Sequence, residues 1–344
     1  MKAFDYLRPT ALDEALAAAG PGVAYLAGGT NLVDLMRAGV ETPHTVVDLT
    51  ALPLDGIEET GTGGLRVGAL VRNSRLAADP RVRDRFPLLA QAVLAGASPQ
   101  LRNMATVGGN LLQRTRCPYF QDTAARCNRR LPGAGCDAAE GLERAHAVLG
   151  ASPHCVAVHP SDLCVALAAL DAEVEIHGRA GPRTVPAASF HLLPGTTPHR
   201  ENALEPGELV TAVVLPGEPA MPSAYRKVRD RASFAFALVS VAAALDVRSG
   251  RVARVRLALG GVAARPWRAH AAERALTGAP ATEAAFRRAV AVELERGAGG
   301  HVSRNTFKRD MALRLAVAVL RDLAAPGDRA VPRDLSVPRE EPGA

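Results

Sequence analysis

Residues 113–155 constrain the fold more than any other part of the sequence, because they carry no helical or strand period yet hold four of the five cysteines. The segment is also rich in Arg and Gly, and a stretch of this kind inside a compact protein needs a ligand to hold its shape. The amino terminus has no basic region followed by a continuous apolar run, so we expect neither a signal peptide nor a membrane span. In such a chain the thiols point to metal before disulfides. The cysteines concerned are Cys117, Cys127, Cys136 and Cys155.

The spacing of these cysteines suits one tetrahedral or cubane site. Nine, eight and eighteen residues separate them in order, and four thiolates can bind either zinc or a [4Fe–4S] cluster. Structural zinc usually shows tight C-x₂₋₄-C pairs, which are absent here, so the spacing favours iron but leaves zinc open. A disulfide pair is the alternative without metal.

Four neighbouring residues are expected to lie outside this site. Cys164 falls in an apolar helical stretch at 162–172 and is typical of a buried small hydrophobe. With four thiols available, we interpret the nearby His146, His154 and His159 as polar loop residues.

Two glycine pairs are candidates for binding a phosphate group. Paired glycines let backbone N–H groups approach an anion closely, and an adjacent Thr or Asn adds donors. Most such pairs are only turns, and neither fits the G-x-G-x-x-G or G-x-x-x-x-G-K-[ST] pattern, which argues against a Rossmann or P-loop site. The first pair lies in Gly28-Gly29-Thr30-Asn31, after a predicted strand, and the second in Thr106-Val107-Gly108-Gly109-Asn110.

The remaining pattern predicts an α+β fold, because helices and strands are mixed without a regular βαβ alternation. We expect helices at 11–19, 85–97 and 162–172, strands at 23–27, 45–49, 65–70 and 208–216, and two further helical stretches at 284–296 and 311–323.

The length of 344 residues suits two or three compact units. A Pro- and Gly-rich stretch at 217–222 marks the predicted boundary. It divides the chain into a unit at 1–220, with the insertion at about 113–158, and a unit at 221–325. The Pro-rich, charged residues 326–344 are expected to form a flexible tail.

The charge pattern disfavours nucleic acid as a partner. The 41 basic and 35 acidic residues give a formal net charge of +6, but Arg is scattered along the chain and does not gather into a long run. Two individual charges have simple structural interpretations: Ser161-Asp162 suits a helix N-cap, and Lys227, among other cations, suits a solvated surface patch.

Five motifs, in this order, resemble the FAD-binding subunits of the xanthine dehydrogenase family, also called molybdenum hydroxylases. The resemblance runs from Phe4 to about Leu323. It implies a two-part FAD-binding domain of the vanillyl-alcohol-oxidase (PCMH-like) type, followed by a smaller α+β C-terminal flavoprotein domain. The motifs are AGGTNLVDLM at 27–36, RNMATVGGNLLQ at 102–113, HPSDLCVALAALDAEVEI at 159–176, YRKVRDRASFAFALVSVAAAL at 225–245 and GGVAARPWRAHAAE at 260–273.

The resemblance implies a set of residues that bind FAD. In that family both glycine loops grip the FAD pyrophosphate, Asp162 matches a helix-start aspartate, and Lys227 matches a lysine near the flavin, where it would stabilise charge that develops on reduction. Val210 is a looser match, on a strand whose backbone passes the flavin. The implied set is Leu26, Ala27, Gly28, Gly29, Thr30, Asn31, Leu32, Thr106, Val107, Gly108, Gly109, Asn110, Asp162, Val210 and Lys227.

The insertion is similar to that of bacterial aldehyde oxidoreductases of the periplasmic type, whose flavin subunit binds a [4Fe–4S] cluster through four cysteines. Those cysteines match Cys117, Cys127, Cys136 and Cys155. Hydroxybenzoyl-CoA-type reductases of the same family also carry an iron–sulfur insertion, so the substrate class is less closely defined than the cofactors.

The family implies two partner subunits, a large one with the molybdenum cofactor and a small one with a [2Fe–2S] centre, in a heterotrimer or its dimer. Electrons would pass through FAD to an external acceptor, so we expect no residues for substrate oxidation in this chain. We expect a cytoplasmic location, with export on a partner's signal to the periplasm as the alternative.

Two rival functions are kept. A free-standing flavoprotein oxidase of the same fold would need its own substrate pocket, and the first glycine loop offers no His or Cys for a covalent flavin link. A zinc-stabilised interaction module without redox function would also use the cysteines and the basic charge.

Overall fold

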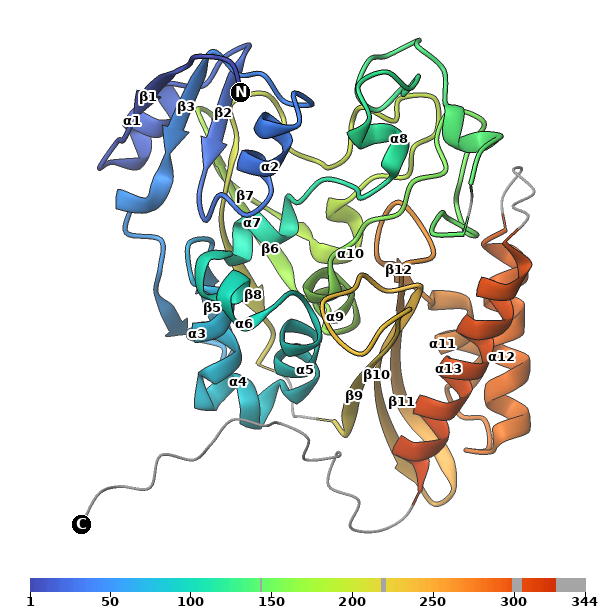
Figure 1. The fold of residues 1–344 in the computed structure, drawn as a ribbon. Helices are drawn as coiled ribbons and strands as arrows, with labels where there is room; N and C mark the ends of the chain where they lie inside the picture. Colours follow the sequence, from blue (N-terminus) through green and yellow to red (C-terminus); the bar gives the residue numbers. More distant parts are fainter. Residues whose placement is uncertain (143, 218–220, 299–304, 326–344) are drawn as a thin grey trace.

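The amino-terminal part of the chain is a small parallel sheet with two connecting helices (Figure 1). The computed structural model describes residues 1–142, 144–217, 221–298 and 305–325. The strands lie in the order β1-β3-β2, and the first glycine loop follows the last residue of β2. The elements are β1 (Asp5–Leu7), α1 (Leu12–Ala17), β2 (Val23–Leu26), α2 (Leu32–Arg37), β3 (Thr45–Asp48) and the 3₁₀ turn η1 (Leu49–Ala51).

A five-stranded antiparallel sheet in the order β4-β5-β8-β6-β7 forms the second layer. Helices α3 to α7, α9 and α10 accompany it, and apolar side chains of all of these except α6 share one large core with β5, β6 and β8. The strands are β4 (Ile57–Glu59), β5 (Leu65–Gly68), β6 (Glu173–Gly178), β7 (Gly181–Pro186) and β8 (Leu209–Leu215). The helices are α3 (Asn73–Ala78), α4 (Pro80–Arg85), α5 (Pro87–Ala95), α6 (Pro99–Met104), α7 (Val107–Leu111), α9 (Asp162–Ala169) and α10 (Ala187–Phe190).

The carboxyl-terminal part is a four-stranded antiparallel sheet in the order β12-β11-β10-β9 that is buried on both faces. Because successive side chains of a strand point to opposite faces, Val241 and Ala243 of β10 pack with α11 to α13, whereas Ala242 belongs to the core that contains α9. This double burial explains the nearly continuous apolar run of β10. The elements are β9 (Ser223–Val228), β10 (Val239–Arg248), β11 (Arg251–Gly260), β12 (Trp267–Arg268), α11 (His270–Leu276), α12 (Glu283–Arg296) and α13 (Thr306–Ala324).

The cysteine-bearing insertion lies beside α2 and above the carboxyl-terminal sheet in Figure 1. As its lack of period predicts, it is mostly irregular, with α8 (Pro118–Gln121) and the 3₁₀ turn η2 (Asp137–Ala139) as short exceptions. Its own small core contains Cys117, Cys127 and Cys155.

The α+β class is confirmed, but several helix boundaries differ from prediction. Helix α1 is shorter than expected and α13 begins five residues earlier, at Thr306; two further cases have local reasons. The helix expected at 85–97 begins instead at Pro87 as α5, because proline suits a first helical turn. The helix expected at 162–172 ends at Ala169, and Asp171 has a positive φ of 53°. The predicted tail 326–344 lies outside the described residues.

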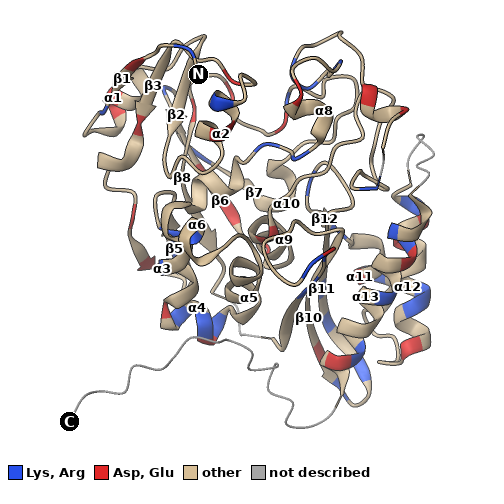
Figure 2. Ribbon diagram, viewed as in Figure 1, with Lys and Arg blue, Asp and Glu red and all other residues tan. Residues whose placement is uncertain are grey.

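Basic and acidic residues are interspersed over the ribbon, for example along α12 and α13 (Figure 2). This agrees with the scattered charge of the sequence. A search of the described helices finds none with the length and apolar character that crossing a bilayer requires.

Candidate cofactor site and candidate metal centre

The two glycine loops, which lie far apart in the sequence, pack directly against each other. The first follows β2, and a Cβ added to Gly28 would lie 2.0 Å from the carbonyl oxygen of Met104, just before the second loop. Gly29 has a φ of +74°, in the region that favours glycine. Glycine is therefore required in the first loop both for close approach and for backbone conformation.

The second loop is fixed by capping and close packing. Thr106 is only 1% exposed, and its Oγ1 accepts a hydrogen bond from the N–H of Gly109 at 3.1 Å, which makes it the N-cap of α7. A Cβ on Gly108 would lie 2.9 Å from the Cβ of Ala69. Thr106 and Gly108 thus hold the loop in place, while Gly109 and Asn110 face a cavity.

This cavity has a volume of about 610 Å³, within the range of small-molecule and cofactor sites. It brings together residues of both loops, of α9 and of β9. Six residues of the predicted FAD-binding set line it: Thr30, Asn31, Gly109, Asn110, Asp162 and Lys227.

The other members of that set do not line the cavity. Val210 is 5% exposed in the core that β8 shares with the helices, so its side chain does not face the cavity. The members outside the lining are Leu26, Ala27, Gly28, Gly29, Leu32, Thr106, Val107, Gly108 and Val210.

Asp162 and Lys227 form a buried ion pair at the cavity wall. Their side chains are 8% and 4% exposed, and the Lys227 ammonium donates to the Asp162 carboxylate at 2.7 Å. Lys227 also donates to the carbonyl of Ala95 at 3.2 Å, and the hydroxyl of Tyr225 donates to Asp162. The simple reading of Lys227 as a solvated surface residue was therefore wrong. The N-cap reading holds for Ser161, whose hydroxyl accepts from the N–H of Cys164 at 3.1 Å.

Basic residues that we did not single out in the sequence also line the cavity. Burial lowers the pKa of Arg116 to about 10, against the opposing effect of Asp34, and the Arg116 guanidinium lies 4.9 Å from the ring centre of Phe236. Arg102 donates to the carbonyl of Gly96 at 2.7 Å. Arg116 directly precedes Cys117, and Arg102 lies in the second motif. Their positions beside predicted ligands could have identified both arginines as candidates from the sequence.

The four cysteines of the insertion gather in one pocket, with none of them in a disulfide. Cys127 and Cys136 face each other across an antiparallel bridge. Burial raises the pKa of the Cys117 thiol to about 11, and the nearby Cys155 and Cys127 add to the effect. Burial and Cys155 raise the pKa of Cys136 as well. The disulfide alternative is therefore wrong for this structure.

Hydrogen-bond donors lie beside two of the four sulfur atoms. The backbone N–H of Tyr119 lies near the Cys117 sulfur, and the N–H of Ala157 donates to the Cys155 sulfur at 3.5 Å. His146, expected to be a polar loop residue, is instead buried, with its Nε2 3.2 Å from the Cys117 sulfur. Such donors stabilise thiolates bound to a metal.

A buried arginine adds positive charge to this pocket. Arg129 is hydrogen-bonded to Cys155 and pairs with the Glu201 carboxylate at 2.9 Å, with its side chain 5% exposed. Burial alone would lower the pKa of Arg129, but Glu201 and Cys155 together raise it above its ordinary value. The guanidinium therefore stays charged beside the sulfur atoms.

The cavity and the cysteine pocket adjoin. A smaller cavity of about 60 Å³ is lined by Cys117 and His146 on one side and by Asp162 and Phe236 on the other. A group bound to the cysteines would thus be a near neighbour of a group in the larger cavity.

Cys164 lies apart from the other cysteines, 3% exposed in the main core, which confirms that it is buried. It contacts a histidine pair, His159 and His191, whose ring centres are 4.0 Å apart. Burial lowers the pKa of His191 to about 4 and that of His159 well below its ordinary value, so both imidazoles are neutral. His154, by contrast, is exposed.

Comparison with known proteins agrees with this architecture. Residues 2–218 match the family described as the FAD binding domain in molybdopterin dehydrogenase, and residues 223–323 match the CO dehydrogenase flavoprotein C-terminal domain. The chain is 52% identical over 330 residues, 94% of this chain and 99% of the relative, to the aldehyde oxidoreductase FAD-binding subunit PaoB of Escherichia coli.

More distant relatives share the fold. The carbon monoxide dehydrogenase medium chain of Afipia carboxidovorans is 28% identical over 84% of this chain and 85% of its own. The solved structure of CO dehydrogenase from Oligotropha carboxidovorans superposes with a TM-score of 0.73 at 25% identity, over 94% of this chain and 98% of that one.

Proposed function

On the premise that the chain belongs to the family of FAD-binding subunits of molybdenum hydroxylases, we propose that it is the FAD- and [4Fe–4S]-binding, electron-transferring subunit of an aldehyde oxidoreductase complex. It is an oxidoreductase subunit. The observation that carries the proposal is the cavity shared by both glycine loops, Asp162 and Lys227, beside a pocket of four cysteines.

The residues of the larger cavity fit FAD. Thr30, Asn31, Gly109 and Asn110 offer backbone and side-chain donors suited to a pyrophosphate. FAD, when bound, accepts electrons singly and releases them in pairs. Lys227, held by Asp162 and by the carbonyl of Ala95, would place an ammonium where negative charge develops on reduction.

The remaining members of the predicted set would act on FAD by shaping the loops. Gly28 permits the contact with Met104, and Thr106 caps the helix that presents Gly109. Val210 would contribute through its backbone alone, on the strand that would pass the flavin.

The cysteine pocket fits a [4Fe–4S] cluster better than zinc. Four thiols from one irregular segment are available, and the tight C-x₂₋₄-C pairs usual for structural zinc are absent. N–H groups together with Arg129 would offset the negative charge of a thiolate-bound cluster. Cys117, Cys127, Cys136 and Cys155 would be the ligands.

The proposal includes partners and a domain division. The partners are a molybdenum-cofactor subunit and a [2Fe–2S] subunit, in a heterotrimer or its dimer, together with an external electron acceptor. Residues 1–220 would form the FAD-binding domain with the insertion at about 113–158, and residues 221–325 the C-terminal flavoprotein domain. A cytoplasmic location is proposed, with export alongside a partner as the alternative.

The test is anaerobic purification of the complex with analysis of its subunits and cofactors. We expect about one FAD and about four irons bound to this chain, and co-purification with subunits that carry molybdenum and a [2Fe–2S] centre. A chain purified with zinc in place of iron, or without flavin absorption, would contradict the proposal and favour a zinc-stabilised interaction module.

The second candidate is the flavin subunit of a related molybdenum hydroxylase or of a hydroxybenzoyl-CoA-type reductase. The 52% identity to an aldehyde oxidoreductase subunit favours the aldehyde enzyme. Assays of the purified complex with aldehydes, N-heterocycles and aromatic CoA thioesters separate the two candidates.

A further inference from the structure

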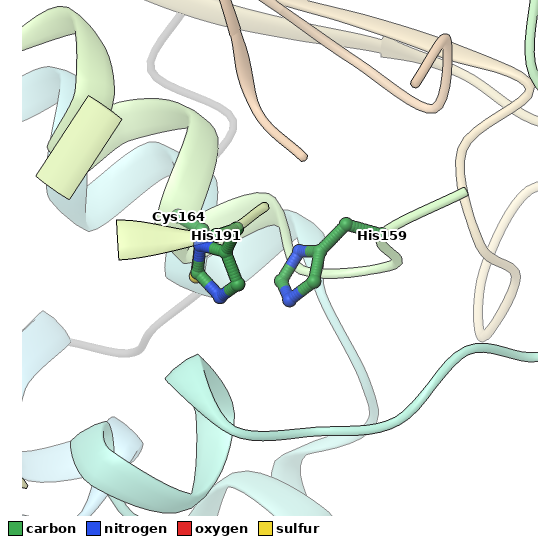
Figure 3. Close-up of side chains that lie close together, drawn as sticks. All are labelled: His159, Cys164 and His191. Atoms are coloured by element: carbon green, nitrogen blue, oxygen red, sulfur yellow. The ribbon is translucent and has the colours of Figure 1, made fainter. Parts of the chain in front are cut away.

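Three metal-ligating side chains from separate segments converge outside the cysteine pocket (Figure 3). His159 precedes α9, Cys164 lies within α9, and His191 follows α10. One ligand atom of each lies within 4.8 Å of the other two. Neither the FAD site nor the four-cysteine pocket uses this group.

Each of the two histidines has one ring nitrogen without a hydrogen-bond partner. His159 Nε2 and His191 Nδ1 are buried and unpaired, and leaving a buried polar atom unsatisfied costs about 1–3 kcal/mol. A bound cation would satisfy His191 Nδ1, which keeps a lone pair because Nε2 carries the proton. His159, whose Nδ1 accepts from the Ser161 N–H at 3.4 Å, would give up that long hydrogen bond to coordinate the cation.

The surroundings orient one ring for this role. His191 Nε2 donates to the carbonyl of Leu111 at 2.9 Å, which leaves Nδ1 as its acceptor. A ring N–H bonded to a backbone carbonyl is the usual arrangement behind a metal-bound histidine. Leu111 is the last residue of α7, so this hydrogen bond also connects the three side chains to the helix of the second glycine loop.

A route from solvent reaches the two histidines. An open cavity of about 570 Å³ is lined by His159 and His191, and also by Glu201 and Glu205. Both carboxylates are paired with arginines, and the cavity has room for a water molecule as a further ligand.

We propose that His159, Cys164 and His191 bind one Zn²⁺ ion, with water from the adjoining cavity as the fourth ligand. Two imidazoles and one thiolate suit zinc in charge and softness. Binding forms the zinc–sulfur bond as the Cys164 thiol gives up its proton to solvent, without change of oxidation state. The ion would brace α9 and α10 against α7.

The test is elemental analysis of the purified, chelator-washed protein with its iron and flavin in place. We expect about one zinc per chain in the wild type, lost in Cys164→Ala and His191→Gln and retained in Cys136→Ser. Far-UV circular dichroism establishes that the variants are folded. Cys164→Ala removes only a sulfur, so the fold should persist, and Gln at 191 can still donate to Leu111.

Cobalt gives a second, independent signal. In protein freed of zinc, Co²⁺ alone should produce a thiolate-to-cobalt absorption band in the wild type and none in Cys164→Ala. The proposal would be overturned if the wild type contained no zinc. It would also be overturned if Cys136→Ser lost its zinc while Cys164→Ala kept it. Iron and FAD are measured in the same samples, so failure here is distinguishable from failure of the proposed function.

Discussion

Asp162→Asn tests whether the ion pair at the cavity wall holds α9 and β9 together. Asp162 begins α9 and Lys227 lies on β9, and both side chains are nearly inaccessible, at 8% and 4% exposure. The substitution keeps the size of the side chain but replaces the carboxylate with a neutral amide, so the buried Lys227 ammonium loses the negative charge that it pairs with.

The expected cost is large because removing one partner of a buried pair leaves an uncompensated charge. Breaking such a pair typically costs about 3–5 kcal/mol. With a urea m-value of about 3 kcal/mol/M, the unfolding midpoint would fall by roughly 1–1.7 M. Replacing Lys227 as well, as Asp162→Asn/Lys227→Met, removes the stranded charge and should restore a large part of the loss.

Urea unfolding followed by circular dichroism measures these effects in flavin-free protein, so that lost FAD binding does not add to them. The reasoning would be refuted if Asp162→Asn lowered the free energy of unfolding by less than about 1 kcal/mol. It would also be refuted if the loss in the double variant equalled the sum of the losses in Asp162→Asn and Lys227→Met. FAD affinity is then measured separately, and we expect it to fall in both single variants because both residues line the cavity.

Three further predictions concern the loops, the cysteine pocket and a buried lysine. Gly28→Ala should abolish FAD retention, because its Cβ would lie 2.0 Å from the Met104 oxygen, whereas Gly61→Ala, with nothing within 4 Å, is the matched control and should keep its flavin absorbance. Cys136→Ser should lose iron while Cys164→Ala keeps it; equal iron contents would reject the ligand assignment. Burial lowers the pKa of Lys308 from 10.5 to about 7. Between those pH values the unfolded chain binds more protons than the folded one, so the free energy of unfolding should rise with pH, by up to about 1.4 kcal/mol per pH unit. Lys308→Met should remove that slope from urea midpoints measured between pH 6.5 and 9, and an unchanged slope would contradict the assignment.

Sequence periodicity alone was sufficient for many individual elements. The strand that ends before Gly28, the capped helix that begins at Asp162 and the irregular insertion all lie where the pattern predicts them, because local propensity, capping and hydrophobic spacing act over a few residues. The ordered motifs likewise indicated the family that the comparisons show.

Contacts between distant segments were decided only by the tertiary structure. Nothing local in the sequence pairs Asp162 with Lys227, seats Gly28 against Met104 or buries His146 beside Cys117. Each contact depends on packing segments from distant parts of the chain against one another. Burial between them determines whether a charged or polar side chain is solvated, paired or available as a ligand.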